Sequence, residues 1–197
     1  SVGGVAATGT ISDDDAAPTI ASVSDASAIE AASIVHTVTL SNPSAVATTY
    51  SLSLSDGSAT GGGTDYTSTL SNAAFSNGVS LAAGVITVPA GVSSFTVTVP
   101  TTADTLDEAD ETYTLAIGAA SATGTIVDDD GAPSIATVTS DTQLEGLSLV
   151  HTVTLSNPSS VATTFAYSLG GGTATGGGTD YTTPPTFSNG VSLLAGN

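Results

Sequence analysis

The chain has 197 residues and a formal charge of −18, because it holds 18 acidic residues, two histidines and no lysine or arginine. Without basic side chains it lacks the contacts that bind nucleic acid or an anionic membrane surface, whereas its 40% of hydrophobic residues is too high for a disordered acidic tail. It has no cysteine and therefore no disulfide, and no apolar run of about 18 residues that would insert into a membrane.

Alternating apolar and polar residues predict a series of short β-strands. In chain order we expect strands at 19–23, 34–40, 46–55, 85–88, 93–99, 111–118 and 122–127. The segment 34–40 shows the alternation best, since Ile34, His36, Val38 and Leu40 fall on one face. No segment has a helical period. Short strands separated by Gly, Pro and Asn turns predict an all-β fold, an antiparallel Greek-key β-sandwich.

The sequence repeats itself with a shift of 115 positions. The motif ATGTISDDD from Ala7 recurs as ATGTIVDDD from Ala122, and HTVTLSNPS from His36 recurs from His151. A period of this length fits one β-sandwich domain of about 100 residues. We therefore expect tandem domains: residues 1–15 hold the last strand of one repeat, residues 16–130 form a complete repeat, and residues 131–197 hold the first four strands of another.

Strand direction places the acidic residues at one end of the complete repeat. If successive strands run in opposite directions, the connections after 19–23, 46–55 and 93–99 and the exit from 122–127 share an end. These places hold Glu30, Asp65, the stretch DTLDEADE at 104–111 and the triplet DDD at 128–130. Carboxylates about 5 Å apart repel by roughly 3 kcal/mol at an effective dielectric constant of about 20. Because Ca²⁺ accepts oxygen ligands from flexible loops, we expect calcium there, and the lack of thiols disfavours zinc.

Three motifs together resemble the Calx-beta domain: SDGSATGGGTDYT from Ser55, DTLDEADETY from Asp104, and GTIVDDD from Gly124. Over its whole length the chain is also similar to the immunoglobulin-like extender repeats of giant RTX-type bacterial adhesins. The resemblance assigns the calcium ligands to Glu30, Asp65, Asp104, Glu108, Glu111, Asp128, Asp129 and Asp130. The corresponding positions in the flanking repeats are Asp13, Asp14, Asp15, Glu145 and Asp180.

Two positions depart from the pattern of that family. Ala103 stands where a second Asp is usual, which bears on how many ions are held. Ala31 stands where Gly is usual, although the next repeat has Gly146 after Glu145.

The resemblance also implies a function. It indicates a non-enzymatic structural repeat of a bacterial adhesin, exported by a type I system to the extracellular cell surface. Calcium would tie each repeat to its neighbours in the array, so that the array projects a distal binding domain for cell adhesion and biofilm formation. We expect neighbouring repeats as partners, with neither nucleic acid nor membrane insertion.

Two other functions are compatible with the residues. Residues 131–197 lack the last three strands of a repeat, so a second copy of the chain could complete them by strand donation and build an extracellular fibre. A direct binding module for glycans or another cell is the third interpretation, which the 5% content of aromatic residues disfavours.

Each motif also has a plainer interpretation. The triplet at 128–130 is typical of a solvated linker, the stretch at 104–111 of a solubilising loop, and Asp65 and Asp180 of turn residues bonded to nearby backbone. His36 and His151 fall at equivalent positions, where we expect a partly buried strand histidine rather than a ligand or base. The many serines come with no Gly-x-Ser-x-Gly elbow, and GGGT lacks the lysine of a phosphate-binding loop, so we expect no enzyme.

Overall fold

The computed structural model describes residues 3–4, 6, 8–12, 14–170 and 172–194. Its contacts divide the chain into two units, Ser1–Gly131 and Ala132–Asn197, and each is described by itself. In the part of the chain that is described, no helix has the length and apolar character needed to span a membrane. Asp13, one of the predicted ligands, lies outside the described residues.

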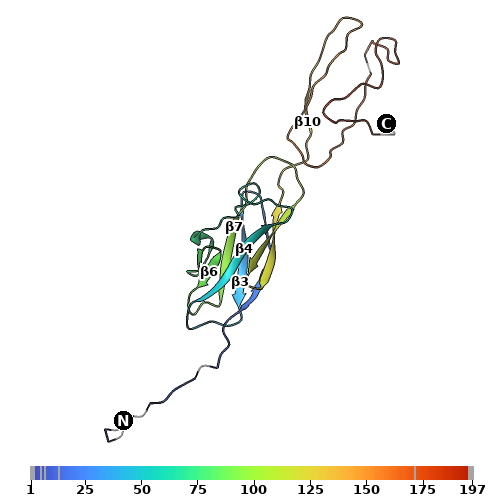
Figure 1. Ribbon diagram of the computed structural model, residues 1–197. Coiled ribbons are helices and arrows are strands. Elements are labelled where there is room, and N and C mark those ends of the chain that lie inside the picture. Colours follow the sequence, from blue (N-terminus) through green and yellow to red (C-terminus); the bar gives the residue numbers. More distant parts are fainter. Residues whose placement is uncertain (1–2, 5, 7, 13, 171, 195–197) are drawn as a thin grey trace. The chain divides into compact units, whose positions relative to one another are not determined.

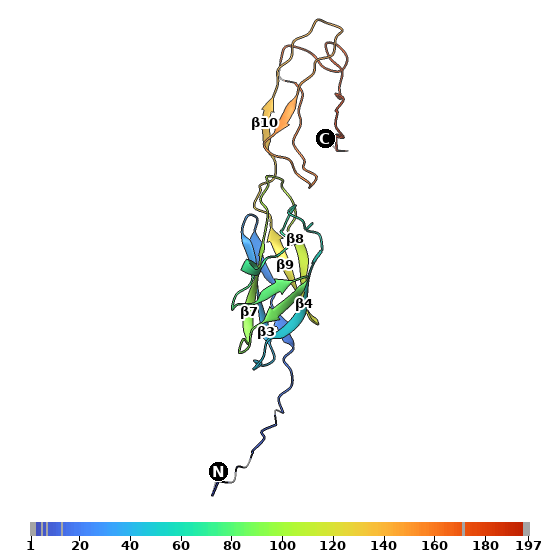
Figure 2. The same ribbon diagram turned by 60° about the vertical axis from the view of Figure 1, so that its left-hand side comes forward.

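The first unit is a sandwich of two β-sheets, seen from two sides in Figures 1 and 2. One sheet has the order β1-β3-β7, formed by β1 (Ile20–Val23), β3 (Ser33–Leu40) and β7 (Ser94–Pro100). The other has the order β2-β9-β8-β4-β6-β5, formed by β2 (Ala26–Ile29), β9 (Ala120–Val127), β8 (Glu111–Ile117), β4 (Thr48–Asp56), β6 (Val85–Val88) and β5 (Ser80–Ala82). Among the described residues, one 3-10 turn, η1 (Asn72–Ala74), lies in the connection between β4 and β5. The prediction of an all-β sandwich is confirmed.

All seven strands expected in this unit are present, but two further strands were not predicted. The first, β2, pairs with β9 in parallel, whereas the sequence pattern indicated antiparallel pairs throughout. It arises because the chain leaves the small sheet after β1 and joins the large sheet after two intervening residues. The second, β5, has only three residues and pairs with β6. Alternation over such short Ala- and Ser-containing segments is too weak a signal to be recognised.

The core lies between the two sheets and follows the alternation of β3. Ile34 and Val38 are fully buried, and they lie opposite Val99 and Phe95 in the antiparallel pairing of β3 with β7. From the large sheet, Leu115 and Ile86 close the same core, along with other buried aliphatic side chains. Aliphatic residues thus supply most of the interior, since aromatic residues are few.

His36 is fully buried, which corrects the expectation of a partly buried side chain. Its Nδ1 lies 2.8 Å from the carbonyl oxygen of Ser24, and its Nε2 lies 2.9 Å from the hydroxyl of Tyr113. A carbonyl only accepts hydrogen bonds, so Nδ1 carries the proton and Nε2 accepts from Tyr113. Both ring nitrogens are therefore satisfied inside the core, as a buried polar side chain requires.

The second unit contains the copy of the first hairpin. β10 (Ile135–Val138) pairs with β11 (Val153–Leu155), with Ile135 opposite Leu155. This register, including its bulge, is that of Ile20 opposite Leu40 in the first unit. Four strands were expected here, but only these two form among the described residues, because no opposing sheet covers them. His151 is exposed for the same reason, which corrects its predicted partial burial. The repeat boundaries stay a prediction.

Candidate metal centre

Four separate segments bring carboxylates to one end of the first unit, which we call the acidic end: Glu30, Asp65, residues 104–111 and residues 128–130. Glu30 directly follows β2, and the triplet directly follows β9. Because β2 and β9 are parallel and Ile29 pairs with Val127, the two segments leave the sheet side by side. Residues 104–110 lie in the connection between β7 and β8, and β8 starts at the same end, since its first residue, Glu111, pairs with Ile126.

The predicted residues form two clusters within the acidic end. Glu30, Asp104 and Asp130 each place one carboxylate oxygen within 4.8 Å of the others, and we call this cluster I. Asp65, Glu108 and Glu111 do the same, and we call this cluster II. The structure therefore brings together six of the residues that the sequence singled out, from four segments that are far apart in the chain.

Cluster I is centred on Glu30, which is buried with 9% of its surface exposed. Burial raises the pKa of Glu30, the negative charges of Asp104, Asp128 and Asp129 raise it further, and a backbone hydrogen bond opposes them. That bond runs from the amide of Asp104 to Oε2 of Glu30 at 3.2 Å. The pKa of Asp130 is also raised, by burial first and then by Asp128 and other nearby carboxylates. The carboxylates of cluster I thus lie close enough to repel one another.

Two oxygen atoms of the triplet are buried without a partner. Asp128 Oδ1 and Asp130 Oδ2 have no hydrogen bond to any described residue. A buried polar atom without a partner costs roughly 1–3 kcal/mol, and a charged one costs more. The chain contains no lysine or arginine that could compensate these oxygens. Hard carboxylate oxygens with unused lone pairs fit a divalent cation such as calcium.

Cluster II depends on the loop between β4 and η1. The backbone amide of Thr60 donates to Oδ2 of Asp65 at 2.6 Å, so Asp65 bonds to nearby backbone, as expected of a turn residue. Asp65 also belongs to cluster II. Burial, the charge and hydrogen bond of Asp65, and the charge of Glu108 together raise the pKa of Glu111 to about 7. The charge of Glu30 adds to this rise, so the two clusters influence each other.

The sequence profile of the Calx-beta domain matches residues 13–143. The chain belongs to the Calx-beta domain family. Among solved structures it is similar to one described as the crystal structure of calcium binding domain CBD12 of CALX1.1, with 18% identity and a TM-score of 0.42. That match covers 56% of this chain and 46% of the other, so the chain spans less than half of that solved protein. No curated protein matches.

The remaining predicted ligands of this Calx-beta domain lie outside the two clusters. Asp128 and Asp129 raise the pKa values of Glu30 and Asp130 through their charge, and Asp129 is exposed. Among the described residues of the flanking repeats, Asp14, Asp15, Glu145 and Asp180 are exposed and belong to no cluster of three. The roles of all these residues as ligands stay a prediction.

Sequence reasoning did not single out two acidic residues that take part in the acidic end. Asp110 accepts a hydrogen bond from the amide of Asp128 at 3.3 Å, and the charge of Asp107 raises the pKa of Asp130. Both lie in the stretch DTLDEADE, but at positions that the family pattern does not use. Their membership of that stretch was the only available signal.

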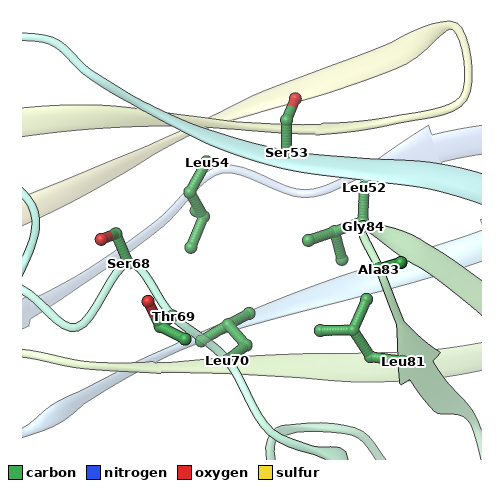
Figure 3. Close-up of a pocket in the computed structure, with 9 residues that line it drawn as sticks. All are labelled: Leu52, Ser53, Leu54, Ser68, Thr69, Leu70, Leu81, Ala83 and Gly84. Atoms are coloured by element: carbon green, nitrogen blue, oxygen red, sulfur yellow. The ribbon is translucent and has the colours of Figure 1, made fainter.

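A cavity of about 430 Å³ lies elsewhere in the Calx-beta domain, beside β4. Figure 3 shows Leu52, Leu54, Leu70 and Leu81 around it. Residues 53–56 of β4 pair with β8 on one edge and have no strand on the other edge in the described part of the chain, because β6 pairs with residues 48–51. The cavity opens beside this unpaired stretch of β4. None of the residues that line it is titratable. The cavity therefore brings no acid or base to a bound molecule.

Proposed function

We propose that this Calx-beta domain binds calcium at its acidic end and acts as a structural repeat without catalytic activity. The observation that carries the proposal is the pair of buried oxygens, Asp128 Oδ1 and Asp130 Oδ2, that lack a partner among the described residues. They belong to a segment that also supplies a member of cluster I. A cation taken from solution would satisfy these oxygens and reverse the repulsion among the carboxylates around them.

Calcium suits these donors better than the other common divalent ions. Every candidate ligand is a carboxylate oxygen on a loop or, for Glu111, at the first residue of β8. Ca²⁺ accepts about six to eight such oxygens in variable geometry. Magnesium keeps several of its waters, and zinc prefers nitrogen and sulfur ligands. Calx-beta domains bind calcium, so membership of the family supports the same choice. The residues would hold the ion, and the ion would supply only electrostatic cross-linking.

A bound ion would also affect the segment through which the chain leaves the domain after β9. Glu30, the loop before β8 and the triplet after β9 would be joined through the ion at the point where the chain continues toward the next repeat. We infer that calcium stiffens this exit, so that tandem domains form an extended stalk. The function that fits is an extender repeat of a secreted bacterial cell-surface adhesin, in cell adhesion and biofilm formation. The 115-residue repeat and the lack of disulfides support this role.

Calcium titration calorimetry on the 197-residue chain, together with melting curves and small-angle scattering in calcium and in EDTA, tests the proposal. We expect calcium to bind in the presence of excess magnesium, to raise the melting temperature, and to give a stiffer scattering profile. The double variant Asp104→Asn, Asp130→Asn should lose most of this response. Asp25→Asn, which removes an exposed charge remote from both clusters, should keep it. Identical melting and scattering curves in calcium and EDTA would rule the proposal out.

A self-assembling fibre is the second candidate, and the exposed hairpin of the second unit favours it. Val153 and Leu155 are 53% and 37% exposed, whereas the equivalent Val38 and Leu40 of the first unit are 0% and 5% exposed. In the first unit β7 covers the corresponding strand edge. A strand from another copy would pair with this open edge. Sedimentation at rising concentration decides: polymers support this candidate, and a monomer at every concentration rejects it.

A further inference from the structure

The loop that presents Asp65 is anchored by Asp56, a residue outside both clusters. Asp56 ends β4, and its Oδ1 accepts two hydrogen bonds. One comes from the hydroxyl of Tyr66 at 2.7 Å and the other from the backbone amide of Gly61 at 2.9 Å. The Tyr66 hydroxyl first, and the Gly61 amide second, lower the pKa of Asp56. The acceptor at the base of the loop is therefore an anion at neutral pH.

Tyr66 connects this anchor to the interior of the sandwich. Its side chain is fully buried, and its ring stacks on the ring of Tyr113 with 4.6 Å between the centroids. Its backbone forms an isolated bridge with Thr101 at the end of β7. Asp65 is the preceding residue, and its carbonyl accepts a hydrogen bond from the amide of Thr102 at 2.9 Å. The position of Asp65 is thus set by contacts with the core.

Within the loop, further bonds orient the side chain of Asp65. The amide of Thr60 donates to Oδ2 of Asp65, and the amide of Gly63 donates to the carbonyl of Tyr66 at 2.9 Å. Gly62 and Gly63 have φ angles of 82° and 94°, which residues with a side chain rarely adopt. The turn and the anchor together direct one carboxylate oxygen of Asp65 toward Glu108 and Glu111.

In the second repeat the turn is present although the acid of the anchor is not. Its loop keeps the same internal bonds, since the amide of Thr175 donates to Oδ2 of Asp180 at 2.7 Å and the amide of Gly178 donates to the carbonyl of Tyr181 at 2.9 Å. The position that corresponds to Asp56 is Gly171 in the sequence. The turn therefore forms without the acid, and the specific contribution of Asp56 is to fasten the turn to the core through Tyr66.

We propose that Asp56 and Tyr66 are positioning residues for a calcium ion at cluster II, a role that rests on the proposed function. Neither residue belongs to the two clusters. They hold Asp65 in the place where it can share an ion with Glu108 and Glu111. Without them the turn is not fastened to the core and has to be fixed in place when the ion binds, which weakens binding. Removing residues that support ligands in this way commonly reduces metal affinity by roughly 10–100-fold.

The test compares Asp56→Ala and Tyr66→Phe with the wild type and with Asp25→Asn. Tyr66→Phe deletes one hydroxyl without changing the charge, so it separates the hydrogen bond from a general electrostatic effect. Asp25→Asn removes one carboxylate that also accepts a backbone hydrogen bond, from Thr123 at 2.7 Å. Calcium affinities of the separate sites are measured by calorimetry and by tyrosine-sensitised terbium luminescence. All variants are studied at a temperature where circular dichroism finds their calcium-free forms folded.

We expect Asp56→Ala to weaken one class of calcium site by about tenfold or more and to leave the other class within about twofold. Tyr66→Phe should weaken the same class, and the double variant should lose less than the sum of the two effects because both remove one interaction. Asp25→Asn should stay within about twofold for both classes. If both classes weaken together, the residues act only on stability and the inference is wrong.

The outcomes separate this inference from the proposed function. A wild-type chain that binds no calcium would overturn both. A wild-type chain that binds calcium, with Asp56→Ala and Tyr66→Phe indistinguishable from Asp25→Asn, would overturn the positioning role alone. If Asp56→Ala does not fold, Tyr66→Phe still decides, since the phenylalanine ring keeps the stacking on Tyr113.

Discussion

The backbone amide of Asp104 donates a hydrogen bond to Oε2 of Glu30 across 74 residues of sequence, at a distance of 3.2 Å. This contact fastens the loop before β8 to the turn after β2. It supplies part of the order of cluster I, while the repulsion among the carboxylates opposes it. The acidic end is therefore held together partly by hydrogen bonds within the chain, against the repulsion of its carboxylates.

Glu30→Gln should change stability in opposite directions with and without calcium. The amide keeps an oxygen to accept from Asp104 but removes a buried negative charge from among Asp104 and the triplet. Without calcium we expect the free energy of unfolding to rise by about 1 kcal/mol. In saturating calcium we expect it to fall, since a site held at 100 times its dissociation constant contributes about 2.7 kcal/mol. Urea unfolding in EDTA and in calcium measures both, and a change of the same sign in both conditions would contradict the assignment.

Without calcium, the free energy of unfolding should decrease as the pH rises from about 4.5 to about 7. The pKa of Glu111 is raised from 4.5 to about 7 in the folded chain, so the folded state binds more protons than the unfolded state in this interval. The stabilising contribution is complete below pH 4.5 and is lost as the pH passes 7. Glu111→Gln should flatten this dependence. Urea unfolding in EDTA at a series of pH values measures it, and stability that increases over the interval would refute the prediction.

Calcium affinity should have the opposite pH dependence. An ion at cluster II needs Glu111 deprotonated, so lowering the pH below about 7 should weaken binding, and binding near pH 6 should release protons. Calorimetry in buffers with different ionisation enthalpies counts the protons released. Affinity and proton release that do not vary between pH 5.5 and 8 would show that Glu111 is not a ligand.

Tyr113→Phe should destabilise the domain through His36. Loss of the hydroxyl leaves Nε2 of His36 buried without a donor, which costs about 1–3 kcal/mol. Tyr50→Phe is the matched control, because its hydroxyl donates to the carbonyl of Pro18 at a partly buried site where water can replace it. Urea denaturation should find the first variant clearly less stable than the second. Equal losses would show that the His36 contact contributes nothing specific.

Ala31→Gly should stabilise the turn that carries Glu30. Ala31 has a φ of 59°, in the left-handed region that costs a residue with a side chain roughly 1 kcal/mol or more. Glycine relieves this strain but makes the unfolded chain more flexible, so we expect a net gain of about 0.5 kcal/mol. Ala109→Gly, at an exposed position without a positive φ, should lose stability instead. Thermal melts of both variants in EDTA test this prediction. A lower melting temperature in both variants would show that Ala31 is not strained.

The sandwich itself was predictable because alternation is local. The pattern of β3 needs only the knowledge that neighbouring side chains of a strand point to opposite faces. The features that were not predicted depend on residues far apart in the sequence. For example, β2 is a strand because β9 lies beside it, and its own four residues carry little signal. His36 is fully buried because Tyr113, 77 residues away, supplies its second hydrogen bond.

The amino-acid sequence by itself determined the β-sandwich, the 115-residue repeat and the gathering of acidic residues at one end, since these follow from period, self-similarity and strand direction. Only the tertiary structure decided which carboxylates share a cluster, which oxygens of the 128–130 triplet are buried without a partner, and that Asp56 anchors the loop of Asp65. The physical reason is that strand direction places a loop at one end of a sheet, whereas distances of a few ångströms depend on the packing of side chains from segments far apart in the chain.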